Sequence, residues 1–124
     1  MRYVIDASVA ITSVVSRPLT SKAVHLRQDY RQGIHELLAP SIFAAEVASV
    51  LTKCERQRII PVGDALPLLD DILSELPQLH AFEPLLRRAT TISSQTRCGL
   101  LDCLYVALAE REGTETGTQL VHST

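Results

Sequence analysis

The fold is decided by residues 2–8, which read RYVIDAS. Their aromatic and β-branched side chains predict a short buried strand over residues 2–5. Asp6 ends the apolar run and opens a helix that we expect to reach about Val15, with Asp6 or Ser8 as its cap. A strand that leads directly into a helix is the repeating unit of an α/β protein.

The same alternation of strands and helices continues through the rest of the chain. Further strands are expected at residues 34–39 and 79–82, with a last strand beginning at Leu120. Helices are expected at residues 21–33, 41–57, 64–76, 84–94 and 100–112. Residues 114–119, which are rich in Thr and Gly, predict a loop. Short strands separated by helices predict a three-layer α/β/α sandwich with a mainly parallel central sheet.

The composition is that of one ordinary folded domain. The chain has 124 residues, of which 46% are hydrophobic and 21% charged, and its net charge is −2. No apolar run reaches the roughly 18 residues of a membrane-spanning helix, and the N-terminus does not resemble a secretory signal. We therefore expect a single cytoplasmic domain over residues 1–124 without membrane contact. The basic residues occur in small clusters, and the sequence does not tell which of them would bind nucleic acid.

The three cysteines predict reduced, buried thiols. Cys54, Cys98 and Cys103 are odd in number and lie in helical or apolar contexts. The chain has no CxxC motif and no His pair at ligand spacing, so a zinc site is not expected.

Three acidic residues stand where an apolar residue would be expected: Asp6, Glu46 and Asp102. A carboxylate on an apolar face loses hydration, and a cation or strong donors must compensate it. In a parallel α/β sheet, ligands bind beyond the carboxyl ends of the strands. Asp6 follows the first strand, Glu46 lies in the first turns of the helix capped by Ser41, and Asp102 lies near a helix start. We therefore expect the three carboxylates to converge.

Converging carboxylates repel one another unless a divalent cation lies between them. Oxygen ligands select Mg²⁺ or Mn²⁺ over zinc or copper, and such an ion is suited to in-line hydrolysis of a phosphodiester. Taken one at a time, the residues have simpler interpretations. Asp6 could be a helix cap, Asp102 an acid favoured by the helix dipole, and Glu46 a surface residue with a buried stem.

Three segments of the chain resemble the PIN domain, in particular the VapC-type ribonuclease toxins of prokaryotic toxin–antitoxin pairs. They are residues 3–9 (YVIDASV), residues 39–47 (APSIFAAEV) and residues 99–110 (GLLDCLYVALAE). The resemblance covers about residues 1–113 in order and spacing, and the last segment is the most specific.

The resemblance implies a ribonuclease that depends on Mg²⁺ or Mn²⁺. By that resemblance Asp6, Glu46 and Asp102 would be both the catalytic acids and the metal-binding residues, with Asp6 and Asp102 ahead of Glu46 as direct ligands. Ser8 would support the site through hydrogen bonds. The family also implies an RNA substrate, a cognate antitoxin that covers the site, and a homodimer.

The C-terminal end departs from the family pattern. PIN domains typically continue into a strand that carries a fourth acid, but the two possible alignments place Leu120 or Thr124 there. We therefore expect a single PIN-like domain whose C-terminal strand and helix are altered or missing after about residue 113. The strand edge left open would favour self-association.

Two other functions remain open at this point. The first is a degenerate PIN domain, weakly active or inactive, that acts as a protein-interaction module. The second, weaker alternative is a phosphoacceptor receiver domain. Receiver domains usually carry an acidic pair after the first strand and a Lys late in the chain, whereas here Asp6 stands alone and no Lys follows Lys53.

Overall fold

The computed structural model describes residues 2–7, 11, 36–113 and 115–116. Ala7 and Ile11 are helical, in agreement with the first predicted helix. The rest of that helix, the helix predicted at residues 21–33 and the strand predicted from Leu120 lie outside the described residues.

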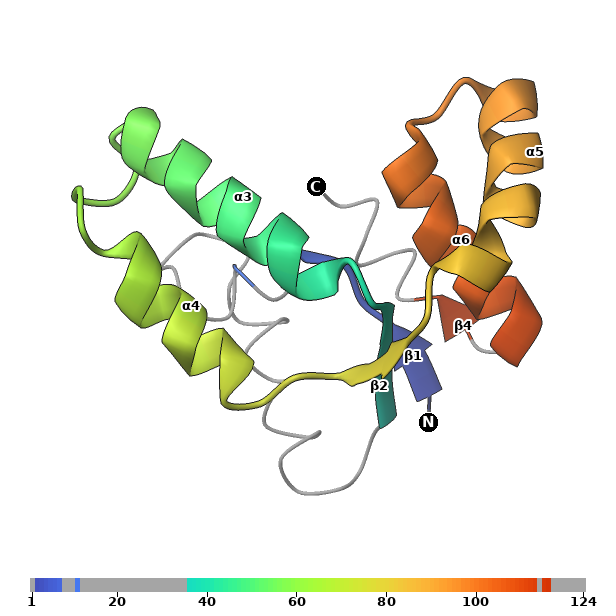
Figure 1. Ribbon diagram of the computed structural model, residues 1–124, viewed down its shortest axis with the longest axis horizontal. Coiled ribbons are helices and arrows are strands. Elements are labelled where there is room, and N and C mark those ends of the chain that lie inside the picture. The colour runs from blue at the N-terminus through green and yellow to red at the C-terminus, as the bar shows by residue number, and fades with distance from the viewer. Residues whose placement is uncertain (1, 8–10, 12–35, 114, 117–124) are drawn as a thin grey trace.

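A four-stranded parallel sheet forms the centre of the described structure (Figure 1). Its strands are β1 (Arg2–Val4), β2 (Glu36–Pro40), β3 (Gln78–His80) and β4 (Glu115–Thr116). They lie in the order β3-β2-β1-β4, and each neighbouring pair is parallel. Val4 lies opposite Leu38, and both side chains are fully buried. The predicted parallel sheet is therefore confirmed.

Two helical hairpins flank this sheet. The helices are α3 (Phe43–Arg56), α4 (Ala65–Leu73), the short 3-10 helix η1 (Glu83–Leu85), α5 (Leu86–Thr96) and α6 (Leu100–Glu112). α3 packs against α4, and α5 packs against α6. Figure 1 shows the first hairpin on one side of the sheet and the second on the other, which is the predicted α/β/α arrangement.

One face of α3 supplies much of the core. Phe43, Val47 and Leu51 are fully buried and Cys54 is nearly so, at the spacing of one helical face. Val50 is only partly buried and packs at the margin of this face.

The turn between α3 and α4 is closed by one carboxylate. Glu55 Oε2 accepts hydrogen bonds from the backbone N–H of Gly63 at 2.9 Å and of Ala65 at 2.8 Å. Gly63 has a φ of 100°, a conformation that glycine adopts at low cost. Because Ala65 is the first residue of α4, Glu55 satisfies a backbone donor that the helix itself leaves without a partner.

Three details near β2 and β3 differ from the prediction. Pro40 is the last residue of β2 and lies opposite His80, whereas the sequence suggests that the strand stops before it. β3 ends at His80 and does not reach Phe82. Ser41 does not cap α3. Its Oγ instead accepts a hydrogen bond from the backbone N–H of Phe82 at 3.2 Å, in the loop after β3, and makes no hydrogen bond to the start of α3.

β4 is a strand where the sequence predicts a loop. Glu115 and Thr116 pair with Tyr3 and Val4 of β1. A polar two-residue segment carries no apolar alternation, so its pairing is set by the position of α6 next to β1 and not by its own pattern. β4 pairs with the side of β1 that β2 does not occupy, so that β1 is not an edge strand at Tyr3 and Val4. The remainder of the tail lies outside the described residues.

α6 has the bounds that the sequence predicts, Leu100 to Glu112, because Gly99 and Gly113 bracket it. Gly113 has a φ of 61°, the left-handed conformation that commonly ends a helix. Most residues in the middle of α6 are buried, on more than one face of the helix. They are Cys103, Leu104, Tyr105, Ala107, Leu108 and Ala109.

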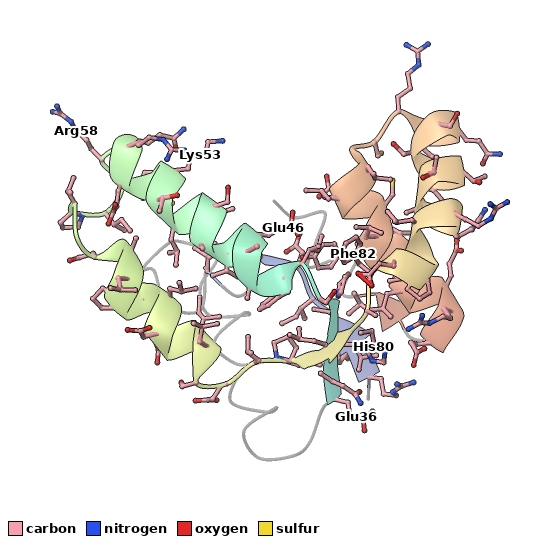
Figure 2. All side chains as sticks on the ribbon, in the orientation of Figure 1. Glu36, Glu46, Lys53, Arg58, His80 and Phe82 are labelled. Carbon is pink, nitrogen blue, oxygen red and sulfur yellow. The ribbon has the colours of Figure 1, made fainter. Side chains whose placement is uncertain are left out.

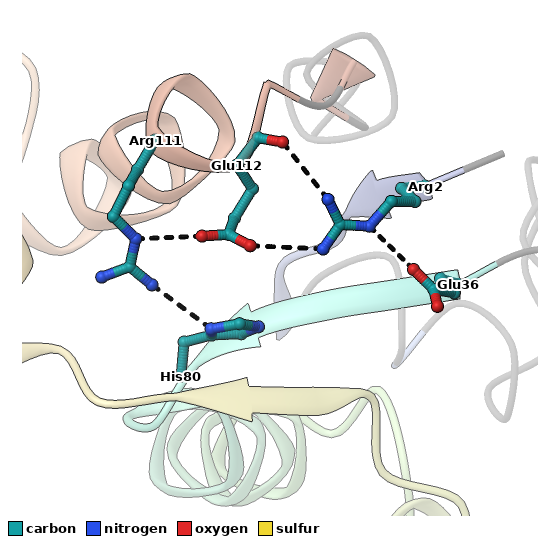
Figure 3. Close-up of polar contacts among 5 residues, drawn as sticks. All are labelled: Arg2, Glu36, His80, Arg111 and Glu112. Atoms are coloured by element: carbon teal, nitrogen blue, oxygen red, sulfur yellow. Dashed lines mark hydrogen bonds and ion pairs between the residues drawn. The ribbon is translucent and has the colours of Figure 1, made fainter.

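A network of charged side chains ties the C-terminal end of α6 to the sheet (Figure 3). Arg2 donates from Nε to Glu36 Oε2 at 2.7 Å, and from Nη2 and Nη1 to the Oε1 and backbone oxygen of Glu112, both at 3.2 Å. Arg111 donates to Glu112 Oε2 at 3.1 Å and to Nδ1 of His80 at 3.2 Å. The last turn of α6 is thereby joined to β1, β2 and β3.

The cysteines follow the prediction in two of three cases. Cys54 and Cys103 are buried and free, but Cys98 is exposed, because it lies in the turn before α6 and not inside a helix. None of the helices in the described ranges has the length and apolar character needed to cross a membrane.

Candidate metal centre

Asp6 and Glu46 follow neighbouring strands of the sheet. Asp6 comes two residues after the end of β1 and is 8% exposed, which makes it the one buried charged side chain within the described ranges. β2 ends at Pro40, and α3 begins three residues later, so that Glu46 falls in the first turn of the helix. Because β1 and β2 are parallel, both acids follow the carboxyl ends of their strands and lie at the same end of the sheet, which is called the acidic edge below.

Asp102 reaches this edge from the other helical hairpin. It lies in the first turn of α6, two residues after Leu100, and its side chain is exposed. An acid in this position is favoured by the partial positive charge of the helix N-terminus. A Cβ built on Gly99 would lie 3.8 Å from Asp102 Oδ2, so the carboxylate sits beside the turn that precedes the helix.

Tyr105 connects the helix of Asp102 with the helix of Glu46. It follows Asp102 by three residues on the same side of α6, and its side chain is 2% exposed. Its hydroxyl donates a short hydrogen bond to Glu46 Oε1 of α3. A residue of α6 is thus joined directly to the first turn of α3.

The titration of Tyr105 and Glu46 reports on the grouping of the carboxylates. Burial raises the pKa of Tyr105 most, and the hydrogen bond to Glu46 and the negative charges of Glu46, Asp6 and Asp102 raise it further. Burial also raises the pKa of Glu46; the bond from Tyr105 opposes this, and the charge of Asp102 adds to it. All three predicted acids therefore act on one buried hydroxyl, and the charges that raise these two pKa values are carboxylates.

The donor chemistry of this edge fits a hard divalent cation. The groups are carboxylate oxygens. Burial raises the pKa of Glu46 most and the charge of Asp102 raises it further, and a bound cation would offset both effects. As the side chains are placed, however, no three His, Cys, Asp or Glu residues within the described part of the chain lie close enough to hold one ion. Asp6 and Asp102 as direct ligands and Glu46 as a catalytic acid therefore stay predictions. Ser8 lies outside the described residues.

Tyr105 is the residue of this edge that sequence reasoning did not assign. It stands within the segment of residues 99–110, but an aromatic residue in a strongly apolar helix is usually a core residue. The available signal was its spacing of three residues from Asp102, which places both side chains on one face of the helix. Its partner, Glu46, is 59 residues away in the sequence. That pairing is not readable from local pattern.

The basic residues at the C-terminal end of α3 lie away from Glu46. Figure 2 shows Lys53 and Arg58 at the end of α3 opposite to Glu46. Ten residues of helix separate Glu46 from Arg56, or roughly 15 Å. On α5, Arg88 is paired with Glu110 at 2.7 Å, and this pairing holds the pKa of Glu110 below its ordinary value.

A parallel sheet with acids after β1 and β2 and at the start of α6 is the arrangement that the resemblance to the PIN domain implies. Residues 3–121 match the model of the PIN domain family. The chain belongs to the PIN domain family, and the resemblance to that family stated from the sequence is confirmed.

The fold itself matches a solved toxin structure. The VapC20 toxin of Mycobacterium tuberculosis, described as a toxin that cleaves the sarcin–ricin loop, superposes with a TM-score of 0.66. The match has 12% sequence identity and covers 94% of this chain and 88% of that chain. At this identity the likeness establishes the fold. No curated protein matches the sequence.

Proposed function

We propose that this protein is a metal-dependent ribonuclease of the toxin type, which hydrolyses RNA phosphodiester bonds at the edge formed by Asp6, Glu46 and Asp102. Mg²⁺ or Mn²⁺ would be the cofactor. One observation supports this function most directly: the hydroxyl of Tyr105, three residues after Asp102 in α6, donates a hydrogen bond to Glu46 of α3, which joins the two segments that carry these acids. Membership of the PIN family agrees with it.

Asp6 and Asp102 would hold the ion. When bound, the ion lowers the pKa of a coordinated water and stabilises the developing charge on phosphorus and the leaving oxygen. Asp6 is buried, so its carboxylate is held in a site with little competing solvent. Asp102 lies at an exposed helix N-terminus, which leaves the ion accessible to a large substrate.

Glu46 would accept a proton. Its raised pKa makes it a better base than an ordinary glutamate. As the oxygen of water forms a bond to phosphorus, the bond from phosphorus to the leaving ribose oxygen breaks. The proton of the water passes to Glu46, and the leaving oxygen takes a proton from solvent.

Two partners are proposed from the resemblance to VapC toxins: a cognate antitoxin that covers the acidic edge, and a second copy of this chain in a homodimer. RNA is proposed as the substrate on the same ground. Because Asp6, Glu46 and Asp102 are all acidic, a bound divalent ion would lower the repulsion between their carboxylates and the RNA backbone.

The test is RNA cleavage by the purified chain with Mg²⁺, with Mn²⁺ and with a chelator. We expect Asp6→Asn and Asp102→Asn each to lower the rate at least about 100-fold, because each removes an anionic ligand. Asp70→Asn, the same change on exposed α4, is the control and should leave the rate unaltered. Equal rates in all four proteins, or a rate indifferent to the chelator, would refute the proposal.

A non-catalytic role is the second candidate. It is favoured by one observation, that no three acids within the described ranges are placed to share an ion. In that case the chain would act as a degenerate PIN domain that binds a protein partner. Cleavage that requires the metal and is abolished by both substitutions would exclude it.

A further inference from the structure

We propose that Tyr105 is a positioning residue, whose hydroxyl holds Glu46 of α3 against α6 and so presents Glu46 to the attacking water and not to the metal ion. The inference rests on the proposed function, to which it adds a residue with no assigned role. It also divides the acids into two kinds: Asp6 and Asp102 as ligands, and Glu46 as a base that is anchored through Tyr105.

The first support is that Tyr105 is a rigid donor. Its side chain is 2% exposed and lies within the buried run of α6, between Leu104 and Ala107. A buried phenol has few rotamers, and its hydroxyl must find an acceptor. That acceptor is Glu46 Oε1. Glu46 is only half-buried, whereas Tyr105 is fixed by the core. The hydrogen bond therefore restricts the glutamate side chain to the position that the tyrosine sets.

The second support is the arrangement of the helices. α3 packs with α4, and α6 packs with α5, whereas α3 does not pack along α6 within the described ranges. Figure 1 shows the two hairpins diverging from the sheet. Without Tyr105, the position of Glu46 relative to Asp102 would depend on a long side chain with several freely rotating bonds. The hydrogen bond fixes it, since Tyr105 and Asp102 share one face of α6.

The third support is the use of the carboxylate oxygens. Glu46 Oε1 accepts a hydrogen bond from the hydroxyl of Tyr105, which disfavours the use of both carboxylate oxygens on one ion and leaves Oε2 to orient a water. A glutamate with one oxygen committed to a phenol is poorly placed to chelate an ion but can still orient one water. This agrees with the finding that the acids of the described ranges do not gather three at a time around a common point.

Tyr105→Phe tests this inference, because it removes one oxygen and keeps the buried ring. We expect kcat for RNA cleavage to fall about 10–100-fold, as for loss of a supporting hydrogen bond. We expect KM for RNA and the Kd for Mn²⁺, measured by electron paramagnetic resonance, to stay within about threefold of wild type, since ligand removal is what costs metal affinity. Tyr3→Phe, the same change in β1, is the matched control and should alter neither kcat nor the Kd for Mn²⁺.

Glu46→Gln supplies the second arm. It should reproduce the loss of kcat with an unaltered Kd for Mn²⁺, and adding Tyr105→Phe to it should cost nothing more, because the two residues act as one unit. Additive losses, an unaltered kcat in Tyr105→Phe, or a loss of Mn²⁺ affinity that matches the loss of kcat would each overturn the proposal.

The failure of the nuclease function can be told apart from the failure of this inference. If the wild-type chain cleaves no RNA with either metal, the proposed function is wrong. The positioning role is then decided by NMR relaxation of the Glu46 side chain. Greater mobility in Tyr105→Phe than in wild type supports it, and equal mobility overturns it.

Discussion

The two ends of helix α6 carry opposite arrangements of charge. At the C-terminal end, hydrogen bonds from Arg2 and then Arg111 hold the pKa of Glu112 below its ordinary value. At the N-terminal end, burial and the charge of Asp102 raise the pKa of Glu46, although the bond from Tyr105 opposes them. The first end fastens the helix to the sheet. The second end keeps carboxylates together at some cost in stability, which is typical of a functional site.

The largest expected effect is a loss of folding stability when a buried residue in the middle of α6 is truncated, because both ends of the helix are held in place by this buried segment. Leu108 is fully buried in α6. Leu108→Ala should lower the free energy of unfolding by about 3 kcal/mol, through lost burial and the cavity left behind. Urea denaturation measures this. Leu101→Ala removes the same atoms from a leucine that is 49% exposed and should change stability by less than about 0.5 kcal/mol. Similar losses in both variants would contradict the burial of this face.

The next largest effect is the stabilisation by a metal ion, which should depend on the N-terminal end of α6 and not on its C-terminal end. An ion that binds only the folded chain stabilises it by about 2.7 kcal/mol at 100 times its Kd. We therefore expect Mn²⁺ to raise the Tm of the wild type, and to raise the Tm of Asp102→Asn much less. Arg88→Ala, which breaks a pair near the other end of the helix, should respond to Mn²⁺ like wild type. A rise in Tm that is equal in all three proteins would place the ion elsewhere.

A smaller effect concerns the pH dependence of stability. The pKa of Glu46 is higher in the folded chain than in the unfolded one. Between the two values the folded chain binds more protons, so the contribution of this group to stability falls as pH rises through that window. Glu46→Gln should therefore raise metal-free stability at neutral pH, by about 0.5 kcal/mol because the carboxylate is only half-buried. The gain should vanish below the ordinary pKa of glutamate.

Thermal unfolding of metal-free protein over a pH series measures this gain. Glu83→Gln, the same change on exposed η1, is the control and should show no such dependence on pH. A loss of stability in Glu46→Gln at neutral pH would mean that the repulsion at this end of α6 is already compensated.

The smallest effect is expected at the C-terminal end. Arg2→Ala removes the contacts to Glu36 and Glu112, but Arg2 and Glu36 are exposed and Glu112 is only partly buried, so that salt screens their pairing. We expect a slightly lower Tm at low ionic strength and no difference at high salt. Arg2→Lys should behave almost like Arg2→Ala, because an ammonium group cannot reproduce the three-way geometry. RNA cleavage should be unaffected in both, and a large loss of activity would mean that the two ends of α6 are coupled.

Local signals predicted the fold where they agreed with tertiary structure. Gly99 and Gly113 set the bounds of α6, and an acid directly after an apolar strand marked the edge of the sheet. Prediction failed where the structure of a segment depends on a partner that is distant in the sequence. Ser41 was assigned to a helix end but bonds to Phe82, and residues 115–116 form a strand because β1 offers an edge. Tyr105 was missed for the same reason, since its acceptor lies on another helix.

The pairing of β1 with β4 has a consequence for rearranging the chain. The first strand and the last described strand lie side by side, while the turn at Gly63 is exposed on the far hairpin. Because β1 and β4 are parallel, a circularly permuted chain opened at Gly63 needs a linker that crosses from the carboxyl end of β4 to the start of β1, and with such a linker it should keep the strand order and bring the same acids together. Such a permutant would turn the hairpin of α3 and α4 into the two new ends of the protein.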